Sequence, residues 1–232
     1  MFGNDSAVTF AGPLEATNEF FRKVYRWMTI GLLLTAVTAQ AVASSQSIMS
    51  ELFTSPGLMM VLIFAELGLV LFLSLGINRI SVNTARAMFA VYSVLNGVTL
   101  SVILLVYTGE SVFAAFLTTA CMFGAMSVYG LYTKRDLTSM RSFLMMGLIG
   151  IIVAALINMF MRSSALDFVI SIIGVLVFLG LTAYDTQKLR DFGARVLDGE
   201  AADKMAVIGA LSLYLDFINL FLYMLRFMGK RR

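Results

Sequence analysis

Apolar residues run along this chain in seven long segments, separated by short polar stretches. Each segment has about the 20 residues that an α-helix needs to cross the hydrocarbon core of a bilayer. Inside lipid, a helix satisfies all of its own backbone hydrogen-bonding groups, so the pattern predicts seven transmembrane helices. The segments are Trp27–Ala43, Gly57–Ile77, Ala87–Tyr107, Ser111–Tyr132, Phe143–Met161, Leu166–Asp185 and Met205–Met228.

The composition excludes the main alternatives to a membrane protein. Of 232 residues, 59% are hydrophobic and 13% are charged, whereas soluble domains have about 45–50% and about 25%. A disordered chain needs the reverse balance, low hydrophobicity and high charge. We therefore predict an all-α membrane protein with one seven-transmembrane-helix bundle over residues 27–228, a cytoplasmic lead at 1–26 and a basic tail at 229–232.

Lysine and arginine concentrate in alternate connections between the segments. Twelve of them fall in the lead and in the loops 78–86, 133–142 and 186–204, whereas Arg162 alone falls in the loops between. The positive-inside rule then puts the N-terminus in the cytoplasm. Seven crossings would put the basic tail outside, against that rule. Either the tail is a tolerated exception or the last segment does not fully cross.

The sequence lacks the residues that several kinds of catalytic and cofactor-binding site need. The chain has no histidine, and its single cysteine, Cys121, lies inside an apolar segment. Phosphate-binding, dinucleotide-binding, zinc-protease and serine-hydrolase motifs are absent from the sequence. We therefore expect neither an enzyme nor a cofactor. The net charge of +3 reflects the basic loops, so the expected partner is the lipid bilayer and not a nucleic acid.

Ionisable side chains inside the segments are the first candidates for function, because burying charge in a bilayer is costly. Asp216 is the strongest, since it lies near the middle of the last segment. At about 100° per residue, it shares one helix face with four other polar side chains. Such a stripe cannot face lipid, which predicts a central position for the last helix. The stripe consists of Ser212, Asp216, Asn219, Tyr223 and Arg226.

Asp185 lies at the inner end of the sixth segment and could meet Asp216. If the sixth helix continues to Gly193 and the seventh starts near Asp203, the two carboxyls lie about 12 Å and about 20 Å from the inner ends of their helices. Tilt and side-chain reach could then bring them together. Two carboxylates in a low-dielectric site cannot both ionise cheaply and titrate as a unit, which would make a pH-responsive element without histidine. The alternative is that Asp185 is a solvated boundary residue.

Two further charged residues have two interpretations each. Glu66 lies about midway along the second segment; it could bind a proton or a cation, or reach a water pocket. Arg79 follows that segment and could pair with a carboxylate, or be an ordinary basic anchor at the membrane surface.

Three short motifs carry a resemblance to a known family. The sixth segment ends in Ala-Tyr-Asp-Thr-Gln at 183–187, and the last contains Leu-Tyr-Leu-Asp-Phe-Ile-Asn-Leu-Phe at 213–221. The fourth ends in Tyr129-Gly130, followed by Thr-Lys-Arg-Asp-Leu at 133–137. In this order, and over nearly all the chain from about Tyr25, they resemble the Bax inhibitor-1 (transmembrane Bax-inhibitor-motif) family, most closely its bacterial inner-membrane branch.

The resemblance implies a fold, a location and an activity. The fold is a seven-helix bundle with two three-helix layers around a central seventh helix, in the bacterial inner membrane. The activity is a pH-sensitive calcium leak controlled by two aspartates, whose positions match Asp185 and Asp216. Carboxylate oxygens suit Ca²⁺, but two residues can give only weak, transient binding. The family's latch arginine falls near Ile77 here, with Arg79 as the nearest substitute.

The resemblance also permits another function. Some bacterial relatives are linked to an ATP-dependent membrane protease, so the chain could be a non-conducting regulator that binds other membrane proteins. A proton-coupled transporter is a third hypothesis.

Overall fold

The structure is a computed structural model that describes residues 13–195 and 199–232. Within these residues the chain forms helices and no β-strand, and seven helices, α1 and α3 to α8, are long and apolar enough to cross a membrane. The predicted all-α, seven-span fold is confirmed. The elements are α1 (Pro13–Ser44), α2 (Gln46–Thr54), α3 (Pro56–Gly76), η1 (Ile77–Arg79), α4 (Val82–Val106), α5 (Gly109–Tyr132), η2 (Thr138–Met140), α6 (Arg141–Met161), α7 (Ser164–Gly193) and α8 (Glu200–Met228).

Three boundaries differ from the sequence pattern. Helix α1 already begins at Pro13, inside the predicted lead, of which residues 1–12 lie outside the described residues. The predicted loop 44–56 contains the extra helix α2, which buries Met49 and Leu52 against Val42 of α1. Helix α7 continues past its apolar segment to Gly193, which is the extension that the pairing of Asp185 with Asp216 requires, so Asp185 lies about two turns inside the helix.

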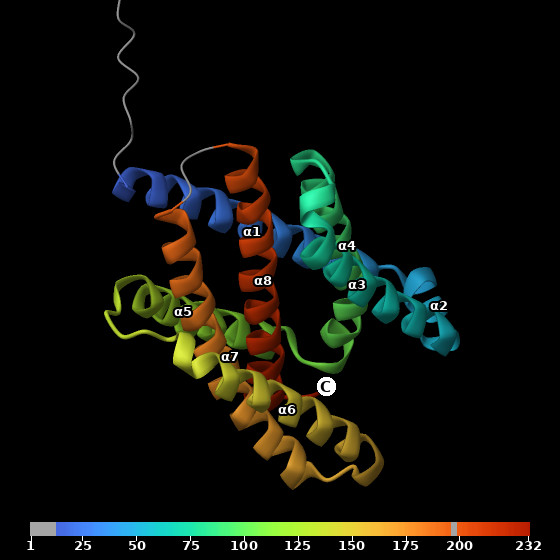
Figure 1. Cartoon of the computed structure of the whole chain (residues 1–232). Helices are drawn as coiled ribbons and strands as arrows, with labels where there is room; N and C mark the ends of the chain where they lie inside the picture. Colours follow the sequence, from blue (N-terminus) through green and yellow to red (C-terminus); the bar gives the residue numbers. More distant parts are fainter. Residues whose placement is uncertain (1–12, 196–198) are drawn as a thin grey trace, which may run out of the picture.

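Helix α8 lies at the centre of the bundle, as its polar stripe predicts. In its most apolar stretch 67% of the residues are buried, against at most 39% in any other span. It contacts α1, α4, α5 and α7, and Figure 1 shows it, in red, in the middle of the molecule. Its Leu213, Tyr214 and Leu220 have no exposed surface.

The other spans form two groups of three, and α1 of the first group also contacts α7 of the second. On one side α3 packs against α4 and α4 against α1, and on the other α6 packs against α7 and α7 against α5. These contacts surround α8 from both sides. A division into two flat three-helix layers stays a prediction.

The two ends of the bundle can be told apart by contacts between helix termini. At one end, here called the α7–α8 end, Asp203 of α8 lies 3.0 Å from both Lys23 of α1 and Arg86 of α4. At the opposite end, the α4–α5 end, Arg226 of α8 lies 3.3 Å from Asp167 at the start of α7. Helix α8 therefore crosses the whole bundle, and residues 229–232 lie at the α4–α5 end.

Candidate functional site

A cavity of about 480 Å³ lies between α6, α7 and α8. Asp185 and Asp216 both line it, so the structure brings the two predicted aspartates to one site. We call it the aspartate cavity. Four of the five residues of the polar stripe face it, namely Ser212, Asp216, Asn219 and Tyr223.

The two aspartates differ in their surroundings. Asp185 of α7 accepts a hydrogen bond from Ser212 Oγ, one helical turn before Asp216 on α8. Asp216 is only 5% exposed, and its Oδ2 is buried with no hydrogen-bond partner among the described residues. Ser212 therefore links α8 to Asp185 by a hydrogen bond. Asp216, on the same helix, adds a second carboxyl group to the cavity.

Two basic residues line the cavity with this pair, and neither of them is Arg79, the one that the sequence suggested. Arg141, the first residue of α6, and Lys188 of α7 line the aspartate cavity and act electrostatically on Asp185. Lys188 could have been found, because it lies three residues after Asp185 on the same helix face. Nothing in the sequence pointed to Arg141, which reaches the site only through the packing of α6 on α7.

Arg79 lies elsewhere. It is exposed in η1, next to the buried Ile77, and no hydrogen bond or ion pair joins it to either aspartate within the described residues. This geometry gives no support to Arg79 as a latch.

Tyr223 and Phe178 form one wall of the cavity. Their rings stack with centroids 5.8 Å apart. The Tyr223 ring lies directly against Gly174 of α7, where a Cβ atom would come within 2.6 Å of it. The guanidinium of Arg226 lies 5.8 Å from the same ring. Between this wall and the aspartates, Asn219 lines the cavity and donates to the carbonyl of Leu215 on its own helix.

Glu66 does not join the aspartates but belongs to a separate polar network between α3, α4 and α8. Its Oε1 accepts a hydrogen bond from Thr99 Oγ1 at 3.0 Å, and its Oε2 accepts from Asn96 Nδ2 at 3.4 Å. Tyr214 of α8 donates to Asn96 Oδ1 at 3.2 Å, and Thr35 of α1 lies 2.6 Å from the Tyr214 hydroxyl. Glu66 thus has neutral partners that connect it to the central helix.

The described residues show no ready-made metal centre. No group of three or more His, Cys, Asp or Glu side chains is placed to hold a metal ion in residues 13–195 and 199–232. The two aspartates can therefore offer only a few oxygen ligands to a passing cation, whereas a stable Ca²⁺ site takes about six to eight.

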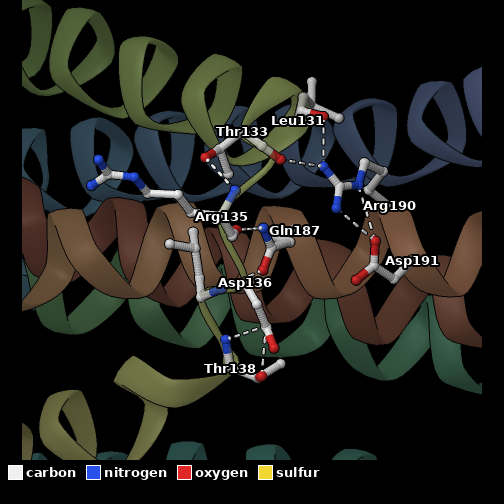
Figure 2. A network of polar contacts seen from close by, with 9 residues as sticks. Leu131, Thr133, Arg135, Asp136, Thr138, Gln187, Arg190 and Asp191 are labelled. Atoms are coloured by element: carbon white, nitrogen blue, oxygen red, sulfur yellow. Dashed lines mark hydrogen bonds and ion pairs between the residues drawn. The ribbon is translucent and has the colours of Figure 1, made fainter.

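The helix that carries Asp185 is tied to the connection between α5 and α6 (Figure 2). Gln187 is buried; its Nε2 donates to the carbonyl of Arg135 at 2.8 Å, and its Oε1 accepts from the amide of Leu137 at 2.8 Å. Arg190 donates to the carbonyls of Leu131 and Thr133 at 3.0 and 3.1 Å, at the end of α5. Two of the sequence motifs, 133–137 and 183–187, therefore dock onto each other.

Gln187→Leu should loosen this connection. The substitution keeps the side-chain volume but leaves the buried Leu137 amide and the part-buried Arg135 carbonyl without these partners, which lowers the free energy of unfolding by about 2–4 kcal/mol. Hydrogen exchange at the Leu137 amide should become much faster. Gln187→Glu is the matched control, because it keeps the acceptor for Leu137. Unchanged exchange at Leu137 in Gln187→Leu would show that this bond does not hold the connection.

Asp136, in the same connection and outside the spans, should titrate at unusually low pH. Its Oδ1 accepts hydrogen bonds from Thr138 Oγ1 at 2.6 Å and from the Thr138 amide at 2.9 Å, and these bonds lower the pKa of the carboxyl. The stability that they contribute is present above the pKa of the unfolded chain and is lost as the pH falls through the folded pKa. Carboxyl chemical shifts against pH should show a higher pKa for Asp136 in Thr138→Val. Equal pKa values in both proteins would contradict this cause.

Comparison with known proteins gives matches along nearly the whole chain. A family model described as "Inhibitor of apoptosis-promoting Bax1" matches residues 17–232. The chain is 51% identical over 216 residues to an uncharacterized protein of Borreliella burgdorferi, covering 93% of each protein. It is 47% identical over 222 residues to the inner membrane protein YbhL of Escherichia coli K12, covering 95% of each. It is also 45% identical over 218 residues to the uncharacterized protein RP147 of Rickettsia prowazekii, covering 94% of this chain and 92% of the relative.

Proposed function

We propose, from the premise that this chain belongs to the Bax inhibitor-1 family of membrane proteins, that it is a pH-sensitive calcium leak. One observation carries the proposal. Two carboxyl groups line one cavity within the spans, and one of them has a buried oxygen that finds no hydrogen-bond partner in the part of the chain that the structure describes. A buried carboxyl oxygen of this kind is stabilised when it binds a proton or a cation.

The packing of α8 supports a gate at the aspartates. A lone ionised carboxylate buried in a low-dielectric site costs several kcal/mol unless it is paired. The neutral form of Asp216 is therefore the one that fits the packing described above. Ionisation would place a second negative charge beside Asp185, and the repulsion would favour a different packing of α7 and α8 or the binding of a cation between them. A change in pH thus changes the balance between two arrangements of the central helix.

Calcium is the cargo of this proposal and not a resident cofactor. Asp185 and Asp216 would touch it through carboxylate oxygens during passage, which suits a hard cation. Arg141 and Lys188 line the cavity toward the α7–α8 end and would repel cations there unless the aspartates are ionised. No catalytic residue and no cofactor are part of the proposal.

We place the α7–α8 end in the cytoplasm of a bacterial cell, with the protein in the inner membrane. Its loops contain most of the lysines and arginines that the positive-inside rule counts. The relative YbhL is an inner membrane protein. The basic segment 229–232 then lies outside, as a tolerated exception to the rule.

Flux measurements on the purified protein test the proposal. The chain is reconstituted in liposomes with an entrapped calcium indicator, and the rate of Ca²⁺ entry is followed from mildly acidic to mildly alkaline pH. We expect a rate above that of protein-free liposomes, with a sigmoidal pH dependence. A folded, reconstituted protein with no flux at any pH would reject the leak and favour a non-conducting regulator that binds other membrane proteins.

A further inference from the structure

A second cavity, of about 410 Å³, lies on the opposite side of α8 from the aspartates, between α1, α4, α5 and α8. We call it the apolar cavity. Four phenylalanines line it: Phe113 and Phe116 from α5, and Phe217 and Phe221 from α8. Neither aspartate contacts it. Its volume falls within the range of about 300–1,000 Å³ that is typical of ligand sites.

Three exposed cations are held next to one end of the apolar cavity. The backbone of residues 229–232 is fastened to the α4–α5 turn: the Thr108 amide donates to the Lys230 carbonyl at 3.1 Å, and the Lys230 amide donates to Ser111 Oγ at 3.0 Å. Gly109 and Val112, on either side of Ser111 along the chain, line the cavity. These bonds use the backbone, so the side chains of Lys230, Arg231 and Arg232 stay exposed and available.

The charge near this opening is positive overall. Glu110, exposed in the first turn of α5, is an acidic residue directly before Ser111, which holds the fastened segment. Together, Glu110 and the three cations have a net charge of +2. An apolar cavity next to a basic segment, at the end of a membrane-spanning bundle, has the chemistry that suits an anionic lipid.

We propose that the apolar cavity binds one acyl chain of a phospholipid with an anionic headgroup. The acyl chain of the lipid lies among the four phenylalanines, and its phosphate is bound by Lys230, Arg231 and Arg232 at the α4–α5 end. The inference does not depend on the proposed calcium leak, because the apolar cavity and the aspartate cavity lie on different faces of α8. Charge complementarity selects an anionic lipid over a zwitterionic one, since the acyl chains of the two are the same.

Native mass spectrometry of the protein released from vesicles of phosphatidylethanolamine and phosphatidylglycerol tests this site. We expect one phosphatidylglycerol to remain bound, in preference to phosphatidylethanolamine. The variant Lys230→Ser/Arg231→Ser/Arg232→Ser should keep the backbone contacts but lose the preference, by about fivefold for each cation removed. Lys134→Ser/Arg135→Ser/Arg195→Ser is the matched control, because it removes three exposed charges at the α7–α8 end; it should keep the preference.

A second variant tests the site of the acyl chain independently of the site of the headgroup. Ala36 lines the apolar cavity and is exposed, so Ala36→Trp should fill it and reduce retention of both lipids severalfold. If the native protein retains no lipid, or retains a free fatty acid instead, the proposal is overturned. It is also overturned if the triple variant at 230–232 keeps its preference for phosphatidylglycerol.

Discussion

Asp216→Asn should make calcium flux independent of pH, at the level that the native protein shows at the acidic limit of its profile. Asparagine has nearly the shape of a protonated aspartate and cannot ionise. In the native protein, gating by one proton changes the flux by at most about tenfold per pH unit across the transition. In Asp216→Asn the same pH range should change the rate by less than about twofold. Stopped-flow calcium entry into liposomes measures both.

Two matched variants make this result specific. Asp167→Asn removes a carboxylate from the same bundle, but one that pairs with Arg226 at the α4–α5 end, so its pH profile should remain native. Asp216→Glu restores a titratable group at the original position and should restore a pH dependence, with a displaced midpoint. A native profile in Asp216→Asn, or a flat one in Asp167→Asn, would contradict the role assigned to Asp216.

Gly130→Ala should destabilise the protein although it adds only one methyl group. A Cβ atom at this position would overlap the carbonyl oxygen of Ala183 on α7 and lie 3.0 Å from the Thr186 Cβ. Because the obstacle is backbone, the whole of α5 must move away from α7, two residues from Asp185. Overpacking of this kind costs about 1–3 kcal/mol. Chemical unfolding in detergent micelles, followed by circular dichroism, gives the difference in free energy.

Gly124→Ala on the same helix is the control for this prediction. A Cβ at position 124 meets nothing within 4 Å, so the substitution should stabilise the protein by up to about 1 kcal/mol through helix propensity alone. Equal effects at positions 124 and 130 would mean that the close approach of α5 and α7 is not what Gly130 permits.

The positions of the helices and the central place of α8 could be predicted because both depend on patterns within one segment. Apolar length predicts a span, and the polar stripe through Asp216 predicts the face that avoids lipid. Asp185 could be paired with Asp216 only on the assumption that α7 and α8 extend beyond their apolar parts, which the structure confirms. The family resemblance is confirmed as well, by a match over residues 17–232.

What the sequence pattern missed depends on contacts between segments. Arg141 looks like an ordinary loop cation until α6 packs on α7 and carries it to the aspartate cavity. The hydrogen bonds of Glu66 to Thr99 and Asn96 depend on the rotation of α3 against α4, for which a nearly uniformly apolar helix gives no signal. Gln187 looked like part of a motif without a role, because its two partners are backbone groups of a distant loop.

The central claim is that Asp185 and Asp216 act as one titrating unit, and a double-mutant cycle on the flux tests it most directly. Calcium entry is measured against pH for the native protein, Asp185→Asn, Asp216→Asn and the double variant. We predict that each single variant alone removes most of the pH dependence and that the double variant adds little, since interacting groups do not contribute independently. Two single variants that each keep the native profile, or effects that add independently, would contradict the claim.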